Sequence, residues 1–192
     1  MDIQHSAIKE LHDFLNSHEI PYALIGGIAV QQWGEPRYTQ DVDLTVVLDM
    51  ARERELVHTI TSHFAPRISD ADVFALDNRV ILVRSISGCP IDISLGLPGY
   101  EEEVIDRAVS VDLGPDTRGI RISTAEDLVV MKIIAGRPRD IDDVEGILIR
   151  QQGVLDTGYI RHKLKDFDEF LETSELSERF ESVEKNALAS RP

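Results

Sequence analysis

The chain has a single cysteine, Cys89, and no hydrophobic run long enough to cross a membrane. One cysteine cannot form a disulfide within the chain, so an oxidising compartment would not stabilise it. A transmembrane helix needs about 20 consecutive apolar residues, and no segment approaches that length. The N-terminal residues also lack the basic start and the apolar stretch of a secretory signal. These absences predict a cytoplasmic protein that does not act at a membrane.

Basic side chains are scarce. The chain has 20 lysines and arginines and 35 acidic residues, which gives a formal net charge of -15. Such a surface repels phosphate backbones at long range, so tight, sequence-independent DNA binding is not expected. A polynucleotide substrate stays open, because a local basic rim can act within an acidic whole. The charge also attracts a partner with a basic surface, although its simplest role is to keep the protein soluble.

Hydrophobic residues make up 42% of the 192 residues and charged residues 29%, a balance typical of a soluble globular protein. This length allows one compact catalytic domain and a small appendage. After an amphipathic helix at 3–15, apolar runs bounded by glycine, proline and asparagine predict a mixed sheet of about five strands. The candidate strand segments are 22–25, 42–48, 72–76, 79–86 and 90–95, and the segments 108–113 and 119–122 are candidates for a further strand pair.

From Ser123 onward the periodicity becomes helical. Thr124 begins a helix with a capping arrangement, and a second helix has Asp140 and Asp143 on a common face. Acidic helices end the chain. The expected fold is therefore α/β, or α+β. A mixed sheet flanked by helices forms a core of residues 1–122, and a helical region of residues 123–192 follows.

Asp41 and Asp43 stand at the start of the apolar strand at 42–48. Alternate residues of a strand point to one side, so both carboxylates face the same space. Like charges beside a core strand are unfavourable unless a cation lies between them. Asp92 offers a third carboxylate on the apolar strand at 90–95. If the two strands are neighbours, the three acids converge on Mg²⁺ or Mn²⁺, which prefer oxygen ligands.

Gly26 and Gly27 follow the strand at 22–25 and precede a short helix. Without Cβ atoms, they let backbone N–H groups approach a phosphate, toward which the helix directs its positive N-terminus. A phosphate at a helix start, opposite metal ions held by an Asp-x-Asp pair, is the geometry needed for phosphoryl or nucleotidyl transfer. On its own, the glycine pair is equally consistent with a tight turn.

Together these residues resemble a known family. Gly26-Gly27, a short helix, the pattern Arg-x-Thr-x-Asp-x-Asp at 37–43 and a later apolar-Asp-apolar strand are similar to the nucleotidyltransferase superfamily of DNA polymerase β. The form found here resembles the AbiEii type, the toxin side of some bacterial toxin–antitoxin and phage-defence pairs. That type also has a downstream lysine and an acidic helix, which Lys132 and the segment 137–143 match.

The resemblance implies that Asp41 and Asp43 ligate the metal. Asp92 is the implied third ligand and general base, and it is assigned from its strand context rather than from a close motif. The chain departs from the family where many relatives have Gly-Ser. Gly27 replaces that serine, so backbone contacts must suffice in the phosphate cradle. The alternative to metal binding is that Asp41, Asp43 and Asp92 lie on solvent-exposed strands. The apolar residues beside them count against it, because an unpaired carboxylate next to a core is energetically unfavourable.

Five further residues are candidates for nucleotide binding: Arg37, Thr39, Lys132, Arg137 and Asp140. The resemblance implies that Lys132 holds the triphosphate and that Asp140 supports the site through Arg137. Three of them have simpler alternatives. Arg37 is equally consistent with a surface residue or an ion-pair partner of Asp41. Thr39 suits a local backbone cap, and Lys132 a solvated helix lysine.

We therefore expect an enzyme that transfers a nucleoside monophosphate from an NTP to a hydroxyl and releases pyrophosphate, with Mg²⁺ or Mn²⁺ as cofactor. The acceptor stays open between RNA such as tRNA, a small molecule and a protein side chain. The acidic surface favours the last two. The alternative is a catalytically silent NTP-binding or partner-binding module of a toxin–antitoxin-like system, with a cognate antitoxin-like protein as its partner.

Overall fold

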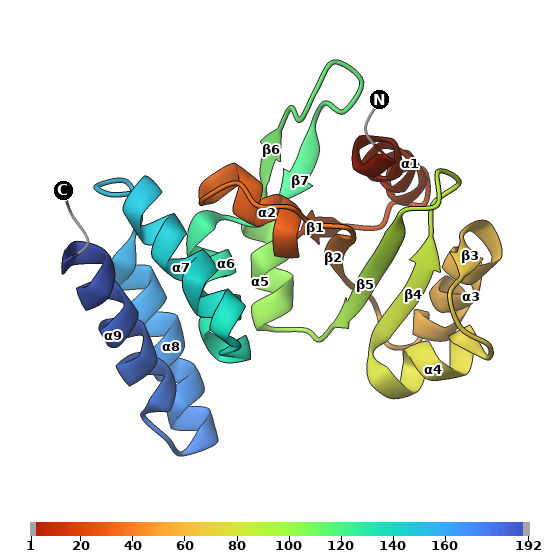
Figure 1. Cartoon of the computed structure of the whole chain (residues 1–192). Helices are drawn as coiled ribbons and strands as arrows, with labels where there is room; N and C mark the ends of the chain where they lie inside the picture. The colour runs from red at the N-terminus through yellow and green to blue at the C-terminus, as the bar shows by residue number, and fades with distance from the viewer. Residues whose placement is uncertain (1–2, 190–192) are drawn as a thin grey trace. The chain divides into compact units, whose positions relative to one another are not determined.

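The computed structural model of the chain describes residues 3–189, which form two compact units. The first, called the sheet unit, contains the residues up to Ile28 and those from Tyr38 to Ser123. The second, called the helical unit, contains Ala29–Arg37 and the residues from Thr124 onward. Figure 1 labels the helices and strands of both units.

Within residues 3–189, seven strands form one mixed sheet, which belongs to the sheet unit. They are β1 (Tyr22–Leu24), β2 (Val42–Val47), β3 (Ala65–Pro66), β4 (Val80–Arg84), β5 (Pro90–Gly96), β6 (Val109–Val111) and β7 (Ile120–Ile122). The order across the sheet is β3-β4-β5-β2-β1-β7-β6, so β2 is the central strand. It pairs in parallel with β5 and antiparallel to β1. The predicted mixed α/β fold is confirmed, with more strands than expected.

Helices accompany this sheet along the chain. They are α1 (Ile3–Ser17), α3 (Glu53–His63), α4 (Ala71–Asn78) and α5 (Tyr100–Arg107), while α2 (Gly26–Trp33) begins in the sheet unit and continues into the helical unit. The predicted amphipathic opening helix is confirmed as α1. Its buried residues recur at spacings of three and four, as a helix with one apolar face requires: Ala7, Ile8, Leu11, Phe14 and Leu15.

The segment predicted as a strand at 72–76 is part of α4, so that prediction is wrong. Ala71 and Ala75 are the buried residues of α4, and their spacing places them on one helical face. Residues 77–78, which lie between the two segments predicted as strands, belong to the last turn of this helix. Arg79 then adopts a left-handed backbone conformation, with φ of 57°, which ends the helix and leads the chain into β4.

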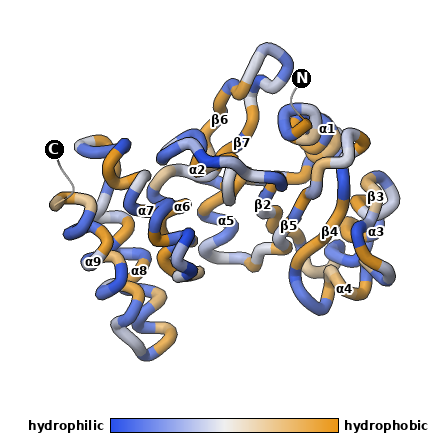
Figure 2. Tube along the Cα trace, in the orientation of Figure 1, coloured by the Kyte–Doolittle hydropathy of each residue, from blue (hydrophilic) through white to orange (hydrophobic). Residues whose placement is uncertain are grey.

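The helical unit contains α6 (Ala125–Ala135), α7 (Pro138–Arg150), α8 (Thr157–Leu171) and α9 (Glu175–Ala189). The hydroxyl of Thr124 accepts a hydrogen bond from the Asp127 N–H at 3.1 Å, which confirms the predicted cap of α6. Gly136 ends α6 with φ of 63°. Figure 2 shows hydrophobic and hydrophilic residues interleaved along α8 and α9. None of the described helices combines the length and the apolar character that a membrane span requires.

Asp168 fastens α8 to α9. It is 4% exposed, and its carboxylate accepts hydrogen bonds from the N–H groups of Leu176 and Ser177 at 3.0 and 2.9 Å. These groups lie in the first turn of α9, where a helix leaves its N–H groups without partners of its own. Burial alone would raise the pKa of Asp168, but hydrogen bonds from Ser177 and Leu176 outweigh it and hold the pKa below its ordinary value.

We expect Asp168→Asn to lower the free energy of unfolding near pH 7 by about 1–3 kcal/mol, because a buried N–H group loses its charged acceptor. The native pKa lies below the ordinary value of 3.8. The carboxylate therefore contributes its full stability above that value, and this contribution disappears as the pH falls through the native pKa. The wild type should lose more stability on acidification than the variant does.

Urea unfolding near pH 7 and again at about pH 3 measures both effects. Asp166→Asn, on an exposed part of the same helix, is the matched control and should change the free energy by less than about 0.5 kcal/mol. Equal stabilities of Asp168→Asn and the wild type near pH 7 would contradict the assigned capping role.

Candidate functional site

Two of the predicted catalytic carboxylates lie side by side. Asp43 in β2 and Asp92 in β5 are register partners in the parallel pair β2–β5. Partners in a sheet point to the same face, so both side chains face the same space. Asp41 precedes β2, and its charge acts on Asp92. The sheet unit thus brings the three predicted acids together.

The alternation of β2 and β5 determines which way Asp43 and Asp92 point. The residues that flank them in the two strands are completely buried: Val42, Leu44, Ile91 and Ile93. A slip of one residue in register would move an aspartate into this core, where an unpaired charge is very unfavourable. The half-buried carboxylates are therefore kept on the opposite, more open face of the sheet.

The first turn of α2 lies directly against Asp43. Gly26 has φ of 61°, and a Cβ atom at this position would lie 2.7 Å from the Cβ of Asp43. At Gly27 a Cβ atom would lie 2.7 Å from the Cβ of Thr39. Glycine is required at both positions because any side chain would overlap these neighbours. The Gly26-Gly27 turn is therefore packed against Asp43 and Thr39, and the approach of a phosphate to its backbone stays a prediction.

Thr39 orients Asp41. Its side chain is buried, and its hydroxyl donates a hydrogen bond to Oδ1 of Asp41 at 2.8 Å. The side chain of Gln4 donates to the carbonyl oxygen of Thr39 and holds this segment from α1. Thr39 therefore positions one of the predicted metal ligands, a contact that neither sequence interpretation of this residue included.

Arg67 is a site residue that had no signal in the sequence. Its Nη2 donates a hydrogen bond to Oδ1 of Asp92 at 2.5 Å. Burial raises the pKa of Asp92 above its ordinary value, and the charge of Asp41 adds to this effect while Arg67 opposes it. Arg67 follows Pro66 at the end of β3 and meets Asp92 only through the pairing of β3, β4 and β5, which no local pattern of residues reveals.

The three carboxylates supply the oxygen donors that suit Mg²⁺ or Mn²⁺. The charge of Asp41 raises the pKa of Asp92, and a cation between the two would relieve this repulsion. Within residues 3–189, no group of three or more His, Cys, Asp or Glu side chains is placed so that it could hold a metal ion. The fit of the three acids to a divalent ion therefore rests on the chemistry of their oxygen donors and not on their positions in this structure.

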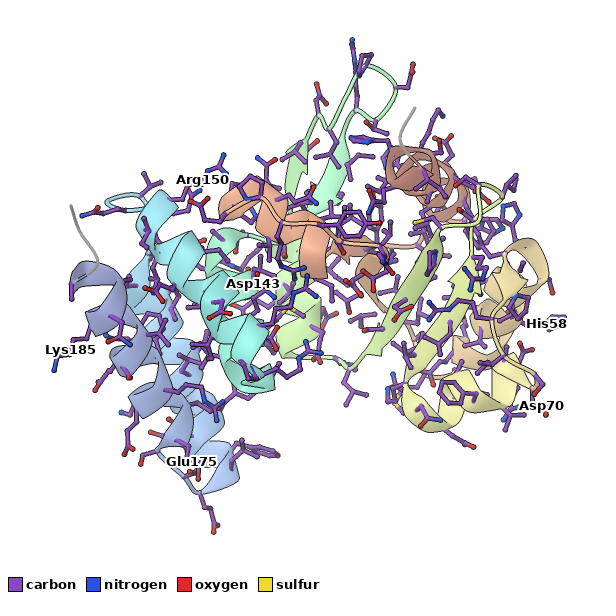
Figure 3. All side chains as sticks on the ribbon, viewed as in Figure 1. His58, Asp70, Asp143, Arg150, Glu175 and Lys185 are labelled. Atoms are coloured by element: carbon purple, nitrogen blue, oxygen red, sulfur yellow. The ribbon has the colours of Figure 1, made fainter. Side chains whose placement is uncertain are left out.

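The predicted cationic residues, Arg37, Lys132 and Arg137, belong to the helical unit. They form a network of alternating charges with two aspartates of α7. Lys132 in α6 donates to Asp140 at 3.1 Å and to Asp143 at 2.6 Å. Arg37 donates to both carboxylate oxygens of Asp143, at 2.7 and 3.0 Å. Arg137 donates to Asp140 at 2.5 Å. Figure 3 labels Asp143 on α7.

Each carboxylate of this network is bonded to two cations. Lys132 is 5% exposed, so it is buried and paired rather than solvated. Burial would raise the pKa of Asp140 and of Asp143, but hydrogen bonds from their cationic partners outweigh it and hold both values below the ordinary one. Asp143 shares a helix face with Asp140, as expected. Its role as the partner of Arg37 was not predicted.

We expect Gly26→Ala to disturb the site, with Gly88→Ala as the matched control. Both glycines have positive φ, 61° and 85°, so alanine costs roughly 1–2 kcal/mol in backbone strain at either position. A new Cβ atom meets Asp43 only at Gly26, because nothing lies within 4 Å of the Gly88 position. Gly26→Ala should lose more stability in urea and should shift the NMR signals of Asp43. Equal losses in the two variants would rule out this close approach.

Solved structures of nucleotidyltransferase type resemble this chain. One is an antigenic nucleotidyltransferase-like protein from Paracoccidioides brasiliensis, with 18% identity, a TM-score of 0.50 and coverage of 90% of this chain and 91% of that chain. Another is ANT(2")-Ia in complex with adenylyl-2"-tobramycin, with 16% identity, a TM-score of 0.58 and coverage of 86% and 98%. The solution structure of ANT(2'')-Ia has 15% identity, a TM-score of 0.54 and coverage of 90% and 97%.

At these identities the likeness concerns the fold, and it confirms the predicted nucleotidyltransferase-type architecture. Among curated proteins, none matches this sequence. A protein family does match, and it carries the description "Nucleotidyltransferase of unknown function (DUF6036)". The match extends over residues 5–187, nearly the whole chain, and the chain therefore belongs to this family of nucleotidyltransferases.

Proposed function

We propose that this protein transfers a nucleoside monophosphate from an NTP to a hydroxyl group and releases pyrophosphate, with Mg²⁺ or Mn²⁺ as cofactor. The observation that carries the proposal is the register of β2 and β5. It places Asp43 and Asp92 side by side on the open face of the sheet, with the first turn of α2 against Asp43. Membership of a nucleotidyltransferase family supports this chemistry.

Each acid has its own role in this proposal. Asp41 and Asp43 are metal ligands, and Thr39 keeps Asp41 oriented. Asp92 is the third ligand and the general base. Its side chain is 33% exposed, so an acceptor hydroxyl can come within the hydrogen-bond distance that proton transfer requires. A bound divalent ion supplies charge neutralisation at the α-phosphate and at the departing pyrophosphate.

The nucleotide phosphates are assigned to the backbone of Gly26 and Gly27, at the end of α2 that attracts anions. The triphosphate roles of Arg37, Lys132, Arg137 and Asp140 stay predictions from the family resemblance. Lys132 lies between two acids, which suits a residue that holds α6 to α7. The side chain of Arg137 is 75% exposed, so it is the most accessible cation of the network.

Membership of the family does not specify which compound accepts the nucleotide. ANT(2")-Ia was solved with adenylyl-2"-tobramycin, and a small molecule with a hydroxyl group is by analogy one acceptor class for this chain. RNA and protein side chains are the other two. The net charge of -15 favours a small molecule or a protein, because long-range repulsion acts against a polyanion.

A silent NTP-binding or partner-binding module is the second candidate. It depends on the AbiEii-like resemblance and on a cognate antitoxin-like partner, both of which stay predictions, as does a cytoplasmic location. The grouping of Asp41, Asp43 and Asp92 counts against this candidate. Like charges collected in one place are unfavourable for a protein that holds no metal there.

We expect Asp43→Asn to lower nucleotidyl transfer by about 100-fold or more, because metal coordination contributes several kcal/mol to transition-state stabilisation. The measurement is incubation of the purified protein with each α-³²P-labelled NTP and Mg²⁺ or Mn²⁺. Total tRNA, lysate protein and small hydroxyl compounds are offered as acceptors. Asp77→Asn, an exposed aspartate of the same unit, is the matched control and should retain full transfer.

Label transferred by the wild type and by Asp77→Asn, but not by Asp43→Asn, would establish the enzyme and identify its acceptor class. Metal-dependent NTP binding without transfer to any acceptor would favour the silent binding module. Absence of NTP binding in the folded wild type would remove the transferase and the NTP-binding form of the silent module.

A further inference from the structure

Arg67 and the two central aspartates lie in one row across the sheet. The backbone N–H of Arg67 donates to the carbonyl of Leu82 at 3.0 Å. Leu82 is the register partner of Asp92, which in turn pairs with Asp43. Residues in such a row point to the same face of the sheet. Neighbouring strands lie about 4.8 Å apart, so the Arg67 side chain has to extend across Leu82 to reach Asp92.

The guanidinium of Arg67 retains most of its hydrogen-bonding capacity. It has five N–H donors, and within the described residues its side chain has one acceptor, Oδ1 of Asp92. The side chain is 20% exposed, so the remaining donors are accessible on the open face while much of the group is shielded from water. A partly desolvated guanidinium with unused donors is a receptor for a planar or tetrahedral anion.

Arg84 adds a second cation on the same face. It follows Leu82 by two positions in β4, so the two side chains point the same way, and Arg84 is exposed. Its register partner in β5 is Pro90. We call Arg67, Leu82, Arg84 and Pro90 the Arg67 shelf. Asp92 is the one acidic residue in β3, β4 and β5, so no other carboxylate of these strands opposes the two arginines.

The Arg67 shelf lies on one side of Asp92, and Asp43 with Gly26 lies on the other. The row runs from Arg67 through Leu82 and Asp92 to Asp43, which has the first turn of α2 against it. In the proposed reaction the nucleotide phosphates are assigned to the Gly26 side. The acceptor hydroxyl must reach Asp92. The rest of the acceptor is therefore assigned to the Arg67 shelf.

We infer that the acceptor is a small hydroxyl compound that carries a phosphate group, and that Arg67 binds this phosphate. The inference rests on the proposed function, because it takes Asp92 as the general base. A base must come within about 3 Å of the hydroxyl, and Arg67 is bonded to the same carboxylate. The phosphate therefore lies only a few bonds from the reacting hydroxyl. Arg67 is a specificity-determining residue in this assignment.

Charge decides between acceptor classes. The positive charges of Arg67 and Arg84 on this face attract a phosphate monoester, and they repel a polycationic acceptor such as an aminoglycoside. A long RNA meets the net charge of -15 over its whole length, whereas a single phosphate experiences mainly the local field of the shelf. A small phosphorylated acceptor satisfies both conditions.

The test compares ribose 5-phosphate with ribose as probes. Each is titrated calorimetrically into the full-length protein with Mg²⁺ and the α,β-methylene analogue of the NTP that the protein binds, which fills the nucleotide site. Wild type should bind ribose 5-phosphate about tenfold or more tightly than ribose, the factor expected for charge-assisted hydrogen bonds. Arg67→Met should abolish this preference, and Arg67→Lys should retain part of it. Arg54→Met, an exposed arginine of α3, is the matched control and should leave it unchanged.

Transfer of the α-³²P label to ribose 5-phosphate, tobramycin and a short RNA with a free 3′ hydroxyl is measured in parallel. Arg67→Met should raise the KM for the phosphorylated acceptor and leave the KM for the NTP unchanged. Transfer to tobramycin or RNA, without a preference for the phosphorylated sugar, would overturn the inference and leave the proposed function in place. An equal loss of binding in Arg54→Met would overturn it as well. Absence of NTP binding would remove the proposed function and the inference together.

Discussion

The parallel, in-register pairing of β2 with β5 is the constraint on which the candidate site depends. Leu44 and Ile93 face the core, and Asp43 and Asp92 face the opposite side. A slip of one residue would exchange these faces, so burial of the apolar residues and exposure of the acids enforce each other. Burial of large aliphatic side chains contributes roughly 1.5–3 kcal/mol each. The core face therefore stabilises a strand pair whose charged face is unfavourable by itself.

The two units treat their buried charges differently. In the helical unit, Lys132 lies between Asp140 and Asp143, and arginines complete the network, so each carboxylate is balanced by a cation. In the sheet unit, Arg67 is the cation bonded to Asp92, and the charge of Asp41 still acts on that carboxylate. The sheet unit thus groups the carboxylates of Asp41, Asp43 and Asp92 in one place. Carboxylates that are each bonded to cations suit a structural role, and a group of neighbouring carboxylates suits the binding of a cation.

Local sequence patterns correctly predicted the features that depend on interactions between neighbouring residues. The periodicity of α1, the capping of α6 by Thr124, and the apolar strands that contain Asp43 and Asp92 follow from neighbouring residues, and each is present. The segment 72–76 failed because its apolar residues suit a strand as well as the short helix α4 that they form.

Contacts set by pairing between distant segments could not be predicted. Arg67 meets Asp92 through three strands, and Arg37 meets Asp143 across more than 100 positions of sequence. The division at residues 122–123 and the triphosphate role of Lys132 stay predictions.

The central claim, that Asp43 and Asp92 share one divalent ion, is tested most directly by titrating Mn²⁺ into the protein and following water-proton relaxation. Wild type should bind Mn²⁺, and Asp43→Asn and Asp92→Asn should each weaken binding by about tenfold or more. Equal Mn²⁺ affinity in all three proteins would contradict it.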